Sequence, residues 1–379
     1  MTAMDVPTTR PEGITADSWQ EWPHNRWAFQ HIDEVLRTAA VPRGEGPVLE
    51  LTDGVPLDAP GLDDELRARS TDALLVLRGR EIRLERYLNG MERDTRHLLM
   101  SVSKSLTSAV FGQYVARGEI DVHEPVATYV DALAESAYGD ATVQQTLDMT
   151  VAVAYDESYD DPDSEVQRHD RSALWRARRP GDPSGVREFL TTLRKDGEHG
   201  RVFHYCSANT DVLAWILEEL TGRPFSELLA TDLWGPLGAE TDAVATVDPE
   251  GFVYANAGIC TTLRDLARFG RMVLDGGVGA HGHAVVPRAW IDDVRKGGVP
   301  GTDVSAMPAS LPNGSYRNQF WLTGDEHGCF FGVGIYGQYV WMNPVTDTVV
   351  ATFSALPTAD DDAAFAAHVD LLHRLSVAI

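Results

Sequence analysis

The sequence is poor in cysteine and contains no long apolar run. Its three cysteines, Cys206, Cys260 and Cys329, form no C-x-x-C pair, so neither a zinc site nor a disulfide framework is indicated. No stretch of about 18 apolar residues occurs, and the polar segment 1–20 has no signal-peptide core. These absences exclude a membrane-spanning helix on sequence grounds. We therefore expect a cytoplasmic protein with no membrane partner.

Positive charge and ion-binding patterns are also scarce. The chain has 32 Lys and Arg against 57 Asp and Glu, a net charge of -25. Such a surface repels nucleic acid, so we expect no nucleic-acid partner. The pair His281 and His283 lacks a third ligand, and the acidic runs 160–163 and 360–362 lack the Gly-and-Glu pattern of a calcium loop. No Gly-rich phosphate loop is present. We expect no metal and no cofactor.

The pattern of apolar residues predicts strands at both ends of the chain and helices between them. A chain of 379 residues, 43% of them hydrophobic, is long enough to bury a large core. The predicted elements are a hairpin over 73–87 that turns at Gly79, helices over 209–220, 263–274 and 363–377, and strands over 330–335, 338–342 and 348–353. This order predicts an α/β fold. We assign 1–130 plus 266–379 to an α/β domain with the central sheet, 131–265 to a mostly helical inserted domain, and the active site to the cleft between them.

The clearest chemical motif is Ser101-x-x-Lys104 at the start of a predicted helix. Its spacing puts both side chains on one helical face, and a desolvated lysine can act as the base that a serine nucleophile requires. The chain has only three lysines, so one of them on a largely apolar helix is unexpected for a surface charge. The structural alternative is a capped helix whose lysine extends its stem along apolar surface to solvent. Residue pattern alone leaves both interpretations open.

Two later elements extend the motif. Tyr205-Cys206-Ser207 precedes a strong helix, and Gly332-Val333-Gly334-Ile335 lies on a predicted strand. With Ser101-x-x-Lys104, they resemble the three ordered motifs of class C β-lactamases and their esterase and peptidase relatives. Within that superfamily, the chain is similar to the 6-aminohexanoate-dimer hydrolases, which are nylon-oligomer hydrolases. The stretches that carry the resemblance include SWQEWPHNRWAF, RHLLMSVSKSL, DPDSEVQRHDRSALW, YCSANTDVLAWI, DLARFGRMVLDGGV and GIYGQYVW.

The resemblance implies a β-lactamase/DD-peptidase-like fold, in which helices flank an antiparallel sheet. It also implies catalytic roles. Ser101 would attack the carbonyl and form an acyl-enzyme, while Lys104 and Tyr205 would share the proton transfers, with the ammonium favouring the phenolate. The backbone N–H groups of Ser101 and Ile335 would form the oxyanion hole.

The resemblance further implies a set of substrate-binding residues. Tyr159 would meet the scissile amide nitrogen from a mobile loop, and Asp170 would meet the substrate's ammonium. The other members are aromatic or polar contacts of the cleft: Trp175, Asn256, Trp321 and Ser207. Taken without the resemblance, a lone Asp more often forms a surface ion pair and a lone Trp more often lies in the core. Two positions depart from the family: Tyr336 stands where His is expected, and Ala257 stands where Gly is expected.

The resulting hypothesis is a serine hydrolase that cleaves linear 6-aminohexanoate oligomers, with side activity on short-chain carboxyl esters. The partner is then a small-molecule substrate, and a homodimer is a family-level expectation. Two alternatives remain open. One is a carboxylesterase or a D-amino-acid amidase or peptidase with the same Ser-Lys-Tyr triad. The other is a catalytically silent binding protein on this fold, which the intact triad disfavours.

Overall fold

Two sheets organise the structure, a computed structural model in which residues 9–378 are described. The large sheet has eight strands in the order β2 (Thr52–Asp53), β4 (Glu81–Tyr87), β3 (Thr71–Arg78), β12 (Thr348–Ser354), β11 (Gln338–Asn343), β10 (Phe330–Gly334), β9 (Phe320–Leu322) and β8 (Ser315–Arg317). Its strands pair antiparallel, except that β2 runs parallel to β4. The small antiparallel sheet has the order β1 (Thr38–Val41), β6 (Ala243–Thr246), β7 (Ile259–Thr261) and β5 (His97–Leu98).

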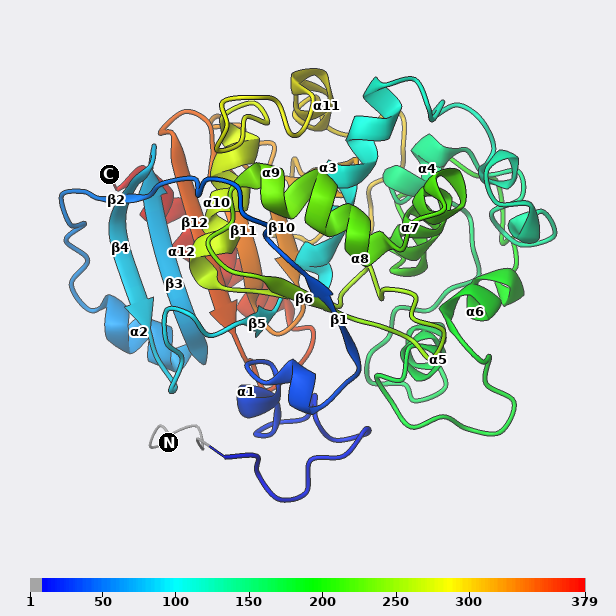
Figure 1. The fold of residues 1–379 in the computed structure, drawn as a ribbon, viewed down its shortest axis with the longest axis horizontal. Helices are drawn as coiled ribbons and strands as arrows, with labels where there is room; N and C mark the ends of the chain where they lie inside the picture. Colours follow the sequence, from blue (N-terminus) through cyan, green and yellow to red (C-terminus); the bar gives the residue numbers. More distant parts are fainter. Residues whose placement is uncertain (1–8, 379) are drawn as a thin grey trace.

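Helices lie around and beside the large sheet. Figure 1 shows the strands of this sheet gathered in one half of the molecule and the region of α4 to α8 in the other, with α3 passing between them. The helices are α1 (Asn25–Ala28), α2 (Leu62–Ala68), α3 (Ser103–Ala116), α4 (Val143–Leu147), α5 (Glu165–Ser172), α6 (Val186–Thr192), α7 (Ala208–Thr221), α8 (Phe225–Leu228), α9 (Gly235–Leu237), α10 (Leu263–Leu274), α11 (Arg288–Val294) and α12 (Asp362–Val377).

The central strands of the large sheet are covered on both faces. Successive side chains of a strand point to opposite faces, so β3 contributes Leu75 and Leu77 to one core and Leu74 and Val76 to the other. Helix α10 packs on the first face and α12 on the second. A strand buried on both faces reads as a continuous apolar run, which explains the sequence of β3.

The predicted fold class is confirmed: helices flank an antiparallel sheet. The strands predicted over 330–353, the hairpin over 73–87 and the three predicted helices all form within a few residues of their expected bounds. The small sheet was not predicted. Two of its strands, β6 and β7, fall inside the segment 131–265, and the domain division itself stays a prediction. Of the helices within residues 9–378, none has the length and apolar character needed to cross a bilayer.

Helix α3 is buried on almost all sides, and this burial includes its serine and threonine residues. Two of its serine hydroxyls find hydrogen-bond acceptors in the turn between β8 and β9. Ser105 Oγ donates to the carbonyl of Gln319 at 2.9 Å, and Ser108 Oγ donates to the carbonyl of Asn318 at 2.6 Å. Because buried hydroxyls need such partners, the helix is fixed in rotation and position. That fixation sets the direction of Lys104 in the first turn of α3 and of Ser101 in the short 3₁₀ turn, Met100–Val102, that precedes it.

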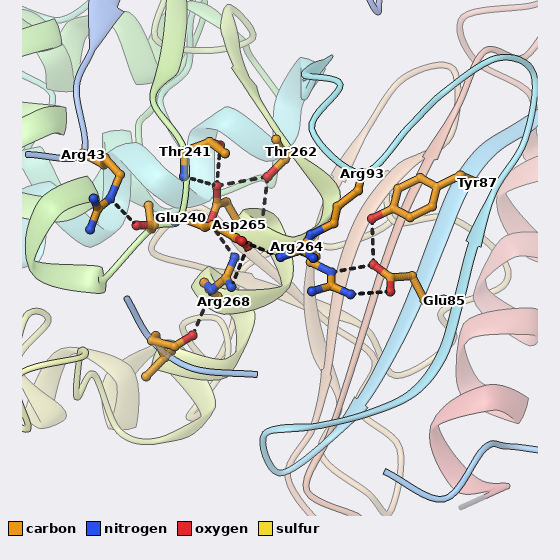
Figure 2. A network of polar contacts seen from close by, with 12 residues as sticks. Arg43, Glu85, Tyr87, Arg93, Glu240, Thr241, Thr262, Arg264, Asp265 and Arg268 are labelled. Atoms are coloured by element: carbon orange, nitrogen blue, oxygen red, sulfur yellow. Dashed lines mark hydrogen bonds and ion pairs between the residues drawn. The ribbon is translucent and has the colours of Figure 1, made fainter. Parts of the chain in front are cut away.

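A polar network ties α10 to three other segments: residues 240–241, β4 and Leu49 (Figure 2). Asp265 is fully buried and accepts hydrogen bonds from the backbone N–H groups of Glu240 and Thr241, at 2.7 and 3.0 Å. It also forms an ion pair with Arg268 at 2.8 Å. Arg264, the residue before Asp265, binds both carboxylate oxygens of Glu85 at 2.7 Å, which joins α10 to β4. Each charged group is paired, as burial requires.

Replacing Asp265 by alanine is expected to destabilise the protein strongly. Removing one partner of a buried charge pair leaves the other uncompensated, which costs about 3–5 kcal/mol of unfolding free energy. The measurement is urea unfolding followed by tryptophan fluorescence. The control is Asp292→Ala, which removes the exposed i,i+4 pair with Arg288 and should have little effect. Equal losses for the two variants would contradict the role given to the network.

Candidate active site

The structure brings Ser101 and Lys104 into direct contact. Lys104 Nζ lies 2.7 Å from Ser101 Oγ, and it donates to Ser207 Oγ and to the carbonyl of Asn256, each at 3.1 Å. The lysine is 1% exposed, which rules out a side chain that extends to solvent. The residue before the serine, Met100, has a φ of +47°, a conformation that non-glycine residues seldom adopt. Such strain is typical of functional sites.

Burial makes the Lys104 ammonium lose its proton more easily than an exposed lysine does. Burial lowers the pKa of Lys104 from 10.5 to about 8, while the nearby carboxylates of Glu157 and Asp211 act in the opposite direction and raise it. A substantial fraction of the lysine is therefore neutral in mildly alkaline solution. A neutral amine 2.7 Å from a serine hydroxyl is placed to accept its proton.

Tyr205 lies close to both Lys104 and Ser101. Its ring centroid is 5.1 Å from Lys104 Nζ. Burial raises the pKa of Tyr205 well above 10, Glu157 raises it further, and a hydrogen bond with Ser101 lowers it in part. This direction is opposite to the phenolate expected from the sequence. The arrangement favours Lys104 as the base and Tyr205 as a neutral proton donor.

The sequence analysis missed Glu157, a carboxylate at the centre of the site. It accepts hydrogen bonds from the Ser207 N–H at 2.9 Å, from the Ser207 hydroxyl, and from the Tyr159 hydroxyl at 2.8 Å. It therefore connects the Tyr159 segment to the start of α7. In an acidic loop with many carboxylates, no local pattern separates Glu157 from its neighbours, because Ser207, which ties it to the site, lies 50 residues away in the sequence.

Two cavities meet at Ser101, Tyr159 and Ile335. The smaller one, of about 20 Å³, has room for about one water molecule. Its other lining residues are Gln20, Met100, Val166, Asp170, Trp175, Ser207, Tyr254, Asn256 and Ala257. The larger one, of about 440 Å³, extends past Tyr205 and Trp321 toward α12. Both are lined by residues from 1–130 or 266–379 together with residues from 131–265.

Asp170 lines the small cavity and is 6% exposed. It accepts a hydrogen bond from the Tyr254 hydroxyl at 2.9 Å, and Arg176 Nε lies 3.7 Å from its other oxygen. Burial raises the pKa of this carboxyl, and Arg176 and Tyr254 lower it in part. The position suits recognition of a cation at the end of a short arm. Arg176, which the sequence analysis did not consider, supplies the compensating charge in the structure.

The other predicted binding residues divide between the two cavities. Trp175 and Asn256 line the small one, and both side chains also hold structural contacts: Trp175 Nε1 donates to Thr246 Oγ1 at 3.0 Å, and Asn256 Nδ2 donates to Asp211 at 2.6 Å. Trp321 lines the large cavity with its ring 5.5 Å from that of Tyr205. All ten predicted site residues therefore lie around one centre.

The two departures from the family pattern also face this centre. Tyr336 follows Ile335 with a φ of +63°, lines the large cavity, and packs edge to face on Phe29 at 5.2 Å. Ala257 lines the small cavity beside Asn256. The sequence analysis did not anticipate that Gln20 and Tyr254 would line the same cavity, since nothing near them in the sequence marks them as site residues.

Comparison with known proteins agrees with this geometry. The beta-lactamase family model matches residues 62–375. The chain is 51% identical over 353 residues to the 6-aminohexanoate-dimer hydrolase of Paenarthrobacter ureafaciens, covering 91% of this chain and 89% of the relative. A Bacillus anthracis structure described as a candidate 6-aminohexanoate-dimer hydrolase superposes with a TM-score of 0.85 at 26% identity, covering 97% and 99% of the two chains. A family VIII carboxylesterase shares the fold at a TM-score of 0.63 and 14% identity, covering 85% and 99%.

The reactivity of Ser101 is expected to follow the ionisation of Lys104. The rate of serine modification by a fluorophosphonate should rise with pH and reach its midpoint at about 8. Glu157→Gln should move this midpoint to lower pH, because Glu157 raises the pKa of Lys104. Asp160→Asn, which removes an exposed charge from the same loop, serves as the control and should leave the midpoint unchanged. A midpoint that does not move in Glu157→Gln would contradict the coupling.

Proposed function

The chain belongs to the beta-lactamase family, within which it is similar to a 6-aminohexanoate-dimer hydrolase, and we propose that it cleaves the amide bonds of linear 6-aminohexanoate oligomers through an acyl-enzyme on Ser101. The observation that carries the proposal is the buried contact between Lys104 Nζ and Ser101 Oγ at the junction of two cavities. One cavity includes the carboxylate of Asp170 in its lining, and the other is wide and lined by aromatic, aliphatic and acidic side chains. A substrate with a terminal ammonium, an apolar spacer and an amide matches that layout.

In acylation, neutral Lys104 takes the proton of Ser101 as the serine oxygen bonds to the amide carbon. The electron pair of the carbonyl moves to its oxygen, and the backbone N–H groups of Ser101 and Ile335 stabilise that charge. Tyr205 then protonates the nitrogen as the C–N bond breaks, and the Lys104 ammonium returns a proton to Tyr205. In deacylation, water attacks the ester carbon and Lys104 takes its proton. As the bond between the carbon and the Ser101 oxygen breaks, Lys104 returns that proton to the oxygen, which restores the hydroxyl and the neutral lysine.

Close packing of β10 against the nucleophile supports the oxyanion role of Ile335. A Cβ atom on Gly334 would lie 2.6 Å from the Leu99 carbonyl oxygen and 2.9 Å from the Ser101 nitrogen. Only glycine allows this approach, which brings the end of β10 beside the Ser101 N–H. The residue after Gly334 is then within reach of the same carbonyl oxygen as Ser101.

The ammonium end of the substrate would be bound by Asp170. The small cavity has room for about one water molecule, so an aminohexanoyl arm requires that Tyr159 move away. The Tyr159 hydroxyl is held by Glu157, and its backbone carbonyl accepts from Gln167 Nε2 at 2.6 Å. Movement of Tyr159 would break these two contacts, and Trp175 would remain as part of the wall. The leaving amine would occupy the large cavity beside Trp321.

Carboxylesterase activity is the second candidate function. A short acyl group fits the small cavity without displacement of Tyr159, and a p-nitrophenyl leaving group fits among the aromatic side chains of the large one. The same triad would serve because a better leaving group needs less protonation. Esters should therefore depend on Ser101 and Lys104 but not on Asp170.

Amide cleavage should depend on the hydroxyl of Ser101. Wild-type protein should release amine from the linear 6-aminohexanoate dimer, and Ser101→Ala should reduce that release to the blank level, since the acyl-enzyme can no longer form. The readout is ninhydrin or chromatographic detection of 6-aminohexanoate. If the wild type hydrolyses a short p-nitrophenyl ester but releases no amine, the amide proposal fails and the esterase alternative replaces it.

Loss of the Asp170 charge should affect amide cleavage and ester cleavage differently. Asp170→Asn should lower kcat/KM for the dimer by about 30–100-fold, because a buried charge partner of the substrate ammonium is lost. Its kcat/KM for p-nitrophenyl acetate should stay close to that of the wild type. Asp163→Asn, at an exposed carboxylate two residues before α5, is the matched control. Equal losses on both substrates would show that Asp170 supports the fold and does not bind the ammonium.

A further inference from the structure

A second cluster of chemically active side chains lies away from the active site. Asp325 and Cys329 belong to the turn that leads into β10, and His373 lies on α12, more than 40 residues later in the sequence. The structure places one donor atom from each of the three within 4.8 Å of the others. Within residues 9–378, this is the one group of three His, Cys, Asp or Glu side chains with that spacing.

The geometry is close to that of a coordinated cation. His373 Nδ1 lies 3.6 Å from Asp325 Oδ2, and the Cys329 N–H donates to the other oxygen of Asp325 at 3.2 Å. Bonds of about 2.0–2.3 Å in a tetrahedral site put donor atoms about 3.3–3.8 Å apart. The His373–Asp325 pair already has this spacing, and all three donors lie within 4.8 Å of one another, so the sulfur would need to move by at most about 1.5 Å. The sulfur is fully buried, while the Asp325 and His373 side chains are 27% and 38% exposed. A cation therefore has a route in from solvent.

Two aromatic side chains, Trp341 and His327, lie against His373. The indole N–H of Trp341 is buried and has no hydrogen-bond acceptor in the described part of the chain. The His327 ring packs edge to face on His373 with centroids 5.4 Å apart, which restrains the imidazole. Such outer contacts are typical of groups that orient metal ligands.

The donor set determines the class of ion. Thiolate and imidazole select borderline or soft divalent transition metals, whereas calcium and magnesium prefer oxygen ligands. A thiolate and a carboxylate together carry two negative charges, which a dication neutralises. Three protein ligands leave a fourth position for water, so tetrahedral zinc is the ion that fits best.

We propose that Asp325, Cys329 and His373 form a zinc site that links the start of β10 to α12. The sequence analysis expected no metal because no cysteine lies in a C-x-x-C pair, and this site combines residues that only the fold brings together. The link has a structural consequence. The far end of β10 carries Gly334 beside Ser101, and α12 carries Phe365, which lines the large cavity. Bound zinc would fix these two walls relative to each other.

Zinc binding to the chelator-treated full chain tests the proposal without reference to activity. Competition with a chromophoric chelator should show one zinc per chain for the wild type. Thermal unfolding should shift upward by about 2–5 °C with excess zinc. His373→Ala should lose both effects. It changes a partly exposed helix residue, so it is expected to fold, and circular dichroism checks that it does.

Two controls and one spectrum identify the ligands. Cys260→Ser and His283→Ala change the same residue types outside the cluster and should keep one zinc per chain. Cobalt in place of zinc should give a thiolate-to-metal charge-transfer band in the near ultraviolet, which Cys329→Ser should abolish. A wild type that binds no zinc, a folded His373→Ala that binds like the wild type, or a cobalt spectrum without the thiolate band would each overturn the proposal.

Discussion

The contact between a buried lysine and a serine hydroxyl is the constraint on which the active site depends. A lysine that is 1% exposed costs free energy to bury in its charged form, and the fold accepts that cost at only one of its three lysines. The three oxygens around Lys104 Nζ come from the start of α3, the start of α7 and the segment before β7. Three distant parts of the chain must therefore be in place before Lys104 can act as a base.

Two carboxylates near Lys104 and Tyr205 change the pKa values of these two groups. Glu157 and Asp211 both raise the pKa of Lys104 against the larger effect of burial, and Glu157 also keeps Tyr205 protonated. The result is a base and an acid with separated pKa values, the condition under which one group can accept a proton while the other donates one. Glu157 also holds Tyr159, so the same carboxylate connects the ionisation of the site to the closure of the small cavity.

Periodicity and motif order predicted the parts of the molecule that local sequence controls. Apolar patterns predicted the hairpin at Gly79, the last three strands and helices α7, α10 and α12. Motif spacing together with the family resemblance predicted Ser101, Lys104 and Tyr205. What was missed depends on contacts between distant segments. The small sheet consists of strands of two to four residues, too short for a clear pattern. Glu157 and Arg176 gain their roles only from partners that the fold supplies.

The central claim is that amide cleavage proceeds through an ester on Ser101. Its most direct test is rapid quenching of the reaction with the linear 6-aminohexanoate dimer, followed by peptide mass spectrometry. The account predicts a transient mass increase of one aminohexanoyl group on the peptide that contains Ser101. Turnover of the dimer with no adduct at any time point, or with an adduct on another residue, would contradict it.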